Sequence, residues 1–526
     1  MSEPGSSSHA SGPIYWDPFN PEISANPYPI YRRLRDELPL YYNDVHDFYT
    51  VSRFSDVDSC LLDAKTFSSA RSDILEFIKA DVEVPPGMFI WMDPPSHTAY
   101  RNVVSRVFTP KRMNLLEQQI RAYCARCLDP LVGSDRIDFI ADLGAKLPGG
   151  VIGMLLGIPD EDRDMIRAKV DESLRTETGK PMDVSQGTYR GDGFEDYVEW
   201  RVKHPSDDLM TELLNVEFQD ETGTRRKLTR EEILVFVSVL AGAGNETTSR
   251  LIGWIGKVLS DHPDQRREIA NDPALVPAAI EEILRVEPPG TQVARYVTRD
   301  VEIHNLTVPA GSILQCLVAA ANRDDRRFPE GDRFDIHRKG APAITFGRGI
   351  HSCIGSALAR VEGRVALDEL LKRFPDWTVD LENSKLSSSS TTRGWDRLPA
   401  AVPRGHRAAA GSHQAAAASI AEQPAPLVSL GGETWQCTLQ TPAGPQEMTV
   451  KLVREGETVT GRIDSPMGGE TISNGKALGD RLTWTMQVSK PMSIKLSFDV
   501  KVEGTQMTGK VKLGLFGSAA LSGHRV

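Results

Sequence analysis

The chain has 526 residues, of which 40% are hydrophobic and 25% are charged, an ordinary composition for a globular protein long enough for two domains. The net charge of −11 argues against nucleic acid or an anionic membrane surface as a general partner. The six cysteines are scattered without a disulfide framework, so a reducing, cytoplasmic compartment is expected. Residues 1–16 are expected to be a flexible N-terminus, with neither a signal peptide nor a membrane anchor.

The first segment with a distinctive pattern follows a Pro-Pro pair. His97 and Arg101 are four residues apart, so they share one face of the helix that is expected there.

Further along, Cys124 and Cys127 form a C-x-x-C sequence in a stretch with a helical pattern. Because no second pair accompanies them, they are expected to be structural thiols rather than zinc ligands.

A long apolar helix is expected from Ile233 to Ile255, with a break at residues 243–248, Ala-Gly-Asn-Glu-Thr-Thr. Gly, Asn and paired Thr are poor helix formers, and burying an acid is normally costly. Such a violation of local rules inside a core element often marks a functional site. Glu246 and Thr247 are therefore candidate functional groups, and a kinked core helix is the purely structural alternative.

Charged residues follow at regular positions. Glu282 and Arg285 are three residues apart on one helix face, a spacing that is also common in solvent-facing ion pairs. Arg295 comes shortly after a Pro-Pro-Gly break, and Arg338 follows a Phe-Asp-Ile-His sequence.

The most informative segment is residues 346–355, Phe-Gly-Arg-Gly-Ile-His-Ser-Cys-Ile-Gly. Cys353 lies among glycines that let the backbone approach a flat ligand closely. Amides at the start of the helix expected next favour an anionic sulfur, and Phe346 can shield the site from water. This arrangement suits a thiolate that binds a metal, although a buried cysteine in a glycine-rich turn is the simpler reading.

This segment resembles the heme-binding loop of the cytochrome P-450 family, whose pattern Phe-x-x-Gly-x-x-x-Cys-x-Gly it fills completely. The other motifs occur in the order found in that family, and the resemblance covers roughly residues 17–403. It implies a mainly α fold with small β-sheets and a heme b cofactor whose iron takes Cys353 as its axial ligand. It also points to the bacterial type of enzyme that lacks a membrane anchor.

The resemblance assigns roles to individual residues. Heme carries two propionates, which need cationic or hydrogen-bonding partners. The implied cofactor-binding residues are His97, Arg101, Arg295, Phe346, His351, Cys353 and Gly355. The implied structural charge cluster consists of Glu282, Arg285 and Arg338. The expected substrate pocket consists of Phe77, Ile78, Phe89, Ala243, Thr291 and Val293.

The resemblance also implies a mechanism. A thiolate ligand favours O–O bond cleavage, and Glu246 and Thr247 are the expected catalytic residues that deliver protons. This acid-threonine pair argues against a peroxide-using relative. We therefore expect an O2-dependent monooxygenase that inserts one oxygen atom into an apolar small molecule such as a steroid, a terpenoid or a fatty-acyl compound. The alternative is a heme-thiolate protein that binds a ligand or acts as a sensor without turnover.

Electrons are expected from an external ferredoxin that is reduced by an NAD(P)H-dependent reductase. The C-terminal region is too short for a flavin reductase, and its one cysteine, Cys437, cannot hold an iron–sulfur cluster alone. Basic residues near the cysteine loop are candidates for docking an acidic ferredoxin. They are Arg106, Lys111, Arg112 and Arg348.

A second domain follows the heme-thiolate monooxygenase domain, which is expected to comprise residues 17–404. Residues 405–426 are rich in Ala and Pro, which is typical of a linker. Residues 427–526 contain short alternating runs separated by Gly, and residues 455–463 are similar to residues 503–511. About eight strands are expected, in an antiparallel meander that forms a small closed barrel or a curled sheet. Its role is open between binding a lipid and binding a protein partner.

Overall fold

The computed structural model describes residues 12–403 and 433–525, except segments 159–175, 185–192, 442–443, 456–457, 466–467, 489–493 and 514–517 and residues 177, 207, 341, 390 and 479. The chain separates into two compact units, Met1–His413 and Gln414–Val526. The expected linker, residues 405–426, lies outside the described residues, so the exact domain limits stay a prediction.

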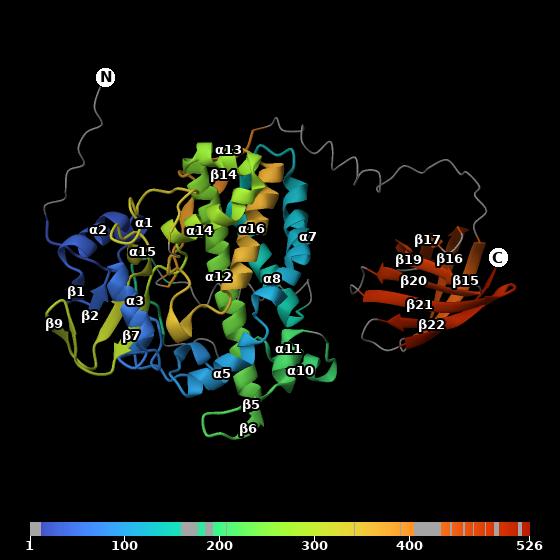
Figure 1. Ribbon diagram of the computed structural model, residues 1–526, viewed down its shortest axis with the longest axis horizontal. Helices are drawn as coiled ribbons and strands as arrows, with labels where there is room; N and C mark the ends of the chain where they lie inside the picture. Colours follow the sequence, from blue (N-terminus) through green and yellow to red (C-terminus); the bar gives the residue numbers. More distant parts are fainter. Residues whose placement is uncertain are drawn as a thin grey trace. The chain divides into compact units, whose positions relative to one another are not determined.

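The first unit is mainly helical with small sheets (Figure 1), as the sequence predicted. Its α-helices are α1 (Pro21–Ala25), α2 (Tyr28–Glu37), α3 (Phe54–Leu62), α4 (Leu75–Lys79), α5 (Ser96–Ser105), α6 (Pro110–Leu115), α7 (Glu117–Leu128), α8 (Leu147–Leu156), α10 (Glu195–Lys203), α11 (Leu209–Asn215), α12 (Arg230–Asp261), α13 (Pro263–Asn271), α14 (Val276–Val286), α15 (Val318–Ala321) and α16 (Ser356–Arg373). The C-x-x-C sequence lies in α7, and both of its cysteines are free thiols.

The largest sheet of this unit has five strands in the order β1-β2-β10-β7-β3. A three-stranded sheet has the order β11-β14-β4, and three further pairs are β12-β13, β5-β6 and β8-β9. The strands are β1 (Leu40–Asn43), β2 (Phe48–Val51), β3 (Phe67–Ser68), β4 (Arg136–Asp138), β5 (Glu217–Gln219), β6 (Arg225–Lys227), β7 (Val293–Val297), β8 (Val301–Ile303), β9 (Leu306–Val308), β10 (Ile313–Cys316), β11 (Thr378–Val379), β12 (Lys385–Leu386), β13 (Trp395–Arg397) and β14 (Pro399–Ala401).

Helix α12 runs through the middle of the first unit and contacts α8, α14 and α16 (Figure 1). It begins with a capping box, in which the Thr229 hydroxyl accepts from the Glu232 amide and the Glu232 carboxylate accepts from the Thr229 amide. Each bond satisfies a backbone donor that the first helical turn leaves unpaired. Most of its side chains are buried, so tertiary packing rather than intrinsic propensity stabilises it.

The expected break in this helix is wrong, because α12 is continuous from Arg230 to Asp261. Two local features allow this. The Thr247 hydroxyl donates a 2.8 Å hydrogen bond to the Ala243 carbonyl within the helix. A Cβ at Gly244 would lie 2.6 Å from Cδ1 of Ile152 in α8, so the glycine lets the two helices approach closely. The weak helix formers therefore serve packing and polar contacts without interrupting the helix.

One stretch of the described chain, Phe139–Leu156, is long and apolar enough to cross a membrane by those two criteria alone. It comprises a turn of π-helix, Phe139–Gly144, followed by α8. Within this stretch 61% of the residues are buried, and it packs against α12. It is therefore explained as part of the protein core.

The second unit is an antiparallel sheet of nine strands, eight of which close into a barrel through the pairing of β16 with both β15 and β17. The strands are β15 (Glu433–Thr441), β16 (Gly444–Glu455), β17 (Thr458–Ser465), β18 (Gly468–Thr471), β19 (Ser473–Leu478), β20 (Arg481–Val488), β21 (Ile494–Glu503), β22 (Gln506–Leu513) and β23 (Ser518–Arg525). The sequence left a closed barrel and a curled sheet open, and the structure has the barrel.

Apolar side chains fill the described part of the barrel interior at alternate positions, such as Trp435, Cys437 and Leu439 on β15. Trp484 and Phe498 are cross-strand partners whose rings stack with centroids 5.1 Å apart. This alternation is what the pleat of a strand requires when one face is buried.

The predicted charge cluster lies in the first unit, where Glu282 and Arg285 of α14 meet Arg338 of a later loop. Arg285 donates to both carboxylate oxygens of Glu282, at 2.8 and 2.7 Å, and Arg338 donates to one of them at 3.0 Å. Arg285 and Arg338 also donate to backbone carbonyls between Asn322 and Arg333. Glu282 and Arg285 are buried, so this cluster fixes a loop that has no regular structure of its own.

Replacing Glu282 by Ala would leave the buried Arg285 guanidinium without its carboxylate. We expect the free energy of unfolding to fall by about 3–5 kcal/mol, as for other broken buried ion pairs, when measured by urea denaturation. Glu281→Ala is the matched control, because this neighbouring exposed residue pairs with Arg360 and should cost only about 0–1 kcal/mol. Equal losses in the two variants would contradict a structural role for the cluster.

Candidate active site

The cysteine loop, residues 346–355, follows a long irregular segment after α15 and leads directly into α16. Gly347 and Gly349 both have positive φ, at +68° and +65°, a conformation that favours glycine. A Cβ on Gly349 would lie 2.9 Å from the Leu61 carbonyl in α3, so α3 can approach the loop only because this residue is glycine. The Cys353 amide donates to the Phe346 carbonyl at 2.8 Å, which folds the loop back on itself.

The surroundings of Cys353 act on its thiol in opposite directions. The Cys353 side chain is exposed at the wall of a cavity, yet the protein around it shields it from bulk water and so raises the pKa of its thiol, while the backbone amide of Gly355 and the Arg101 guanidinium favour the thiolate. Cys353 lies shortly before α16, which begins at Ser356. The first amides of that helix, including that of Ser356, therefore face the sulfur. The thiol therefore lies in an apolar setting with hydrogen-bond donors ready for a negative charge.

Cys353 borders a cavity of about 310 Å³ in the first unit. The wall combines Phe346 and Cys353 of the loop with Ala243 and Thr247 of α12 and Val293 of β7. Aliphatic residues such as Leu251, Leu284 and Val318 line another part of the cavity, and charged or hydroxyl-bearing residues complete the wall. A cavity of this size and character is typical of a site for a cofactor or an apolar small molecule.

Polar groups gather at one side of this cavity. His351, Arg101 and Arg295 line it, and the ring of His97 lies 4.3 Å from that of His351. Among the described residues, both ring nitrogens of His97 and Nε2 of His351 are buried without a hydrogen-bond partner. Burial, followed by the nearby Arg101 cation, lowers the pKa of His97 to about 4. Burial and the Arg295 cation lower the pKa of His351 to about 3.

These features fit a heme. Buried imidazole nitrogens without partners beside two guanidinium groups suit the acidic propionates, and a single thiol at the cavity wall suits the iron. The Arg101 guanidinium also donates to the Ser352 carbonyl, which ties this polar edge to the cysteine loop. Phe346 lines the cavity and packs under the Arg360 guanidinium, 4.4 Å from its ring centroid.

Glu246 and Thr247 are neighbours on α12 but face different surroundings. Thr247 lines the cavity. Glu246 is buried away from the wall, where its carboxylate accepts from the Thr392 hydroxyl at 2.7 Å and from Arg250 at 3.5 Å. The structure thus places the threonine at the cavity and directs the acid toward the segment around Thr392.

The residues expected to line the substrate pocket are dispersed. Ala243 and Val293 lie on the cavity wall, and Thr291 lines a neighbouring polar pocket. Phe77, Ile78 and Phe89 are buried, and Phe89 stacks on Phe236 of α12. The assignment of all six residues to a substrate pocket stays a prediction.

Comparisons with known proteins agree with this geometry. Residues 195–394 match the Cytochrome P450 family. The chain is 36% identical over 399 residues to the vitamin D(3) 25-hydroxylase of Pseudonocardia autotrophica, covering 75% of this chain and 97% of the relative. A mutant of P450 EryK in complex with erythromycin B is 31% identical with a TM-score of 0.66, covering 74% of this chain and 98% of that protein.

A third similar protein is CYP109E1 from Bacillus megaterium in complex with testosterone, 27% identical with a TM-score of 0.66. It covers 73% of this chain and 99% of its own. The chain therefore belongs to the cytochrome P450 family and is a heme-containing monooxygenase, an oxidoreductase. The C-terminal unit lies outside these similarities.

Sequence reasoning missed the polar contacts of Glu246. Thr392 is 146 positions away from it, and Arg250 reads as an ordinary charge inside a helix. Only a generally polar character of residues 387–393 was noticeable in the sequence. No local pattern indicates that this segment returns to the middle of α12.

Substituting Phe for His97 would keep a ring beside His351 but remove both unpartnered nitrogens. We expect heme to dissociate about fivefold faster, because about 1 kcal/mol of hydrogen bonding to the heme edge is lost. Transfer of heme to excess apomyoglobin measures this rate. His337→Phe, at an exposed histidine paired with Glu268, is the control and should leave it unchanged. Equal rates for the His97 variant and the wild type would remove His97 from the heme-binding set.

Proposed function

We propose that this monooxygenase inserts one oxygen atom into an apolar molecule of steroid size, using O2 and electrons from a ferredoxin. The observation that carries this proposal is that Cys353 and the Ala243–Thr247 turn of α12 border one cavity. Its apolar wall suits a substrate with few polar groups, such as a steroid, a terpenoid or a fatty-acyl compound.

The proposed roles of the residues follow from their positions. Heme, when bound, would supply the oxygen-activating chemistry, and the Cys353 thiolate would hold its iron. His97, Arg101, Arg295 and His351 hold its acidic edge. Thr247 presents its hydroxyl to the cavity, where it can orient a proton donor, and Glu246 resupplies protons from behind the cavity wall. The apolar wall excludes bulk water, so protons enter only where polar groups admit them.

The steroid class is supported by two of the similar proteins. One is named a vitamin D(3) 25-hydroxylase, and another was solved with testosterone. A third was solved with the macrolide erythromycin B, which keeps larger substrates in view. We place a steroid first because two of these three similar proteins are linked to steroid-type compounds by name or by bound ligand.

A ferredoxin is the proposed electron donor, served by an NAD(P)H-dependent reductase, and the proposed location is the cytoplasm. Arg106 and Lys111 are exposed and stand as candidates for its docking. The other two candidates already form ion pairs, Arg112 with Glu212 and Arg348 with Asp58. Exposed ion pairs contribute little stability, so a partner carboxylate can replace these contacts.

For the C-terminal barrel we propose partner binding in preference to lipid binding. Buried apolar side chains occupy the described interior positions, including Trp435, Trp484 and Phe498. An eight-stranded barrel has room either for such side chains or for one small ligand. The filled interior favours the first case.

The proposed substrate class is tested by titrating the ferric protein with testosterone, vitamin D3, erythromycin B and palmitic acid while recording the heme spectrum. We expect a low-spin to high-spin shift that is tightest for one of the two steroid-type compounds. A shift confined to erythromycin B or palmitic acid would contradict the steroid class. Repeating the titration on a shortened chain that ends at Gly411 tests the role of the barrel. If the barrel binds lipid for the enzyme, its removal should weaken the apparent affinity for the compound, whereas removal of a partner-binding barrel should leave that affinity unchanged.

Thr247→Ala tests turnover against simple ligand binding. Without the hydroxyl at the cavity, we expect the fraction of consumed O2 released as hydrogen peroxide to rise about fivefold or more, since proton delivery loses its final group. Thr298→Ala, at a hydroxyl bound to the Lys65 carbonyl far along the chain, serves as the control. A protein that only binds ligands would show the same slow O2 consumption in both variants.

A further inference from the structure

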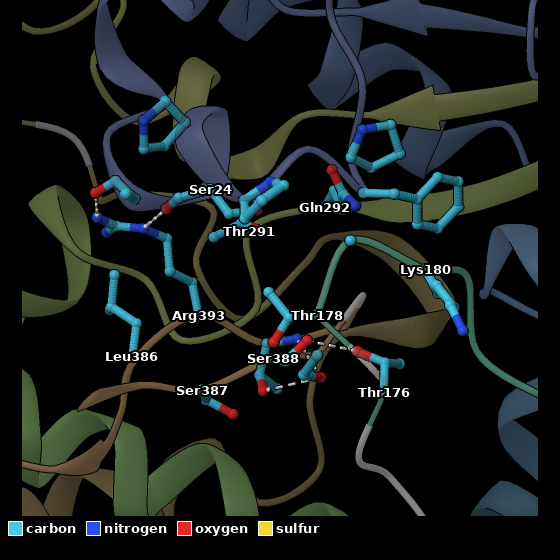
Figure 2. Close-up of a pocket in the computed structure, with 18 of the residues that line it drawn as sticks. Ser24, Thr176, Thr178, Lys180, Thr291, Gln292, Leu386, Ser387, Ser388 and Arg393 are labelled. Carbon is cyan, nitrogen blue, oxygen red and sulfur yellow. Dashed lines mark hydrogen bonds between the residues drawn. The ribbon is translucent and has the colours of Figure 1, made fainter.

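A second pocket, about half polar in its lining, lies beside the heme cavity. It has a volume of about 130 Å³, and prolines and aromatic residues of the N-terminal region form part of its wall. The polar part carries the hydroxyl groups of Thr176, Thr178, Ser387 and Ser388, which Figure 2 labels, and that of Ser389. Ser388 and Thr176 hydrogen-bond across it through their hydroxyls at 3.0 Å (Figure 2). Thr178 and Lys180 are exposed, so this pocket reaches the protein surface.

A thin wall separates this pocket from the heme cavity. Pro289 and Gly290 line the heme cavity, while the next residues, Thr291 and Gln292, line the polar pocket. Gly290 forms a β-bridge with Thr392, and the Arg393 amide donates to the Pro289 carbonyl at 2.8 Å. The backbone around Thr392 is therefore fixed against the wall itself.

Hydroxyl groups connect the polar pocket to Glu246. The Thr392 side chain lines the pocket, is nearly buried, and donates to the Glu246 carboxylate at 2.7 Å. The hydroxyl oxygen of Ser389 lies 3.4 Å from that of Thr392 and 3.0 Å from that of Thr391. Arg250 bonds both Glu246, at 3.5 Å, and the Ser387 hydroxyl, at 2.7 Å. Each of these hydroxyls can both donate and accept a hydrogen bond.

We propose that Thr392 is a positioning residue that joins Glu246 to this polar pocket, and that the protons consumed in the reaction enter the protein through the pocket's hydroxyl groups. This inference rests on the proposed relay role of Glu246 and names the source of its protons. In the step envisaged, Glu246 gives a proton toward Thr247 by a rotation of its side chain. The carboxylate then returns to Thr392 and, in one concerted shift, takes the Thr392 proton while Thr392 receives a proton from pocket water, directly or through Ser389, and bulk solvent restores the proton of that water.

The arrangement explains how the heme cavity can stay apolar while protons are supplied. The wall keeps water of the polar pocket out of the cavity, and Glu246 is a buried ionisable group in contact with the pocket's hydroxyls. Arg250 also donates to the Trp395 carbonyl and to Asp396, the latter at 3.1 Å. Arg250 thereby holds the Glu246 carboxylate between the heme cavity and the second pocket. Charge at Glu246 is thereby balanced inside the protein core.

The test uses the heme-loaded full chain with a surrogate ferredoxin and reductase, and testosterone as the probe. O2 consumption and peroxide release are measured in H2O and in D2O. For Thr392→Val we expect O2 consumption to slow about tenfold and the solvent isotope effect to increase about twofold, because proton supply becomes limiting. Thr392→Ser retains the hydroxyl and should restore both values. Ser384→Ala removes a hydroxyl that bonds only the Leu381 carbonyl in the described contacts and should change neither.

A structural readout accompanies the kinetic one. A crystal structure of the heme-loaded protein should contain an ordered water within about 2.7–3.2 Å of the Thr392 or Ser389 hydroxyl, and Thr392→Val should lose its contact at position 392. If Thr392→Val fails to retain heme, Thr392→Ala provides the same comparison with a smaller side chain.

The outcomes separate this inference from the proposed function. An unchanged rate and isotope effect in Thr392→Val, together with a changed isotope effect in Glu246→Gln, would overturn the pocket as the proton source and leave the Glu246 role intact. Wild-type behaviour in both variants would remove Glu246 from the relay altogether. Wild-type behaviour in the valine variant with no water at the pocket would equally overturn the inference.

Discussion

The site in the first unit depends on one electrostatic constraint, because Cys353 lies in apolar surroundings and yet must carry a negative charge. Shielding from bulk water by the surrounding protein raises the pKa of Cys353 and favours the neutral thiol. The amides at the start of α16 and the Arg101 guanidinium act in the opposite sense. Gly347 and Gly349 bend the loop so that these donors meet the sulfur, and α3 closes over the loop where a larger residue would collide.

One turn of helix α12 forms part of the cavity wall and also holds a buried acid in a polar environment. Its Ala243 and Thr247 border an apolar cavity, whereas Glu246 contacts Thr392 and Arg250 on another side. Glu246 and Thr247 are neighbours on this mostly buried helix, so the two environments lie on adjacent faces of one turn. The same helix packs closely against α8 because residue 244 has no side chain to intervene. Packing and chemistry therefore share the residues that are unfavourable for a helix in isolation.

Much of this could be predicted from the sequence because the decisive features are local. The spacing within residues 346–355 is a continuous motif, and the Glu282–Arg285 pair lies within one helical turn. The sequence also indicated the functional segment of α12, but its propensities wrongly suggested a break, since they ignore packing by α8. Contacts between distant segments could not be predicted from local sequence patterns. Thr392 contacts Glu246, for example, although the two residues are 146 positions apart in the chain. In the second unit, alternation predicted strands, whereas barrel closure depends on the pairing of β16 with β17.

The central claim is that Cys353 ligates heme as a thiolate. Its most direct test is the absorption spectrum of the reduced protein under carbon monoxide, compared with Cys353→Ser and with Cys437→Ser as a matched control. We predict the long-wavelength band that thiolate ligation produces in the wild type and in the Cys437 variant, and its loss in the Cys353 variant. A band at the position of histidine-ligated heme proteins in the wild type, or a thiolate band that persists without Cys353, would contradict this account.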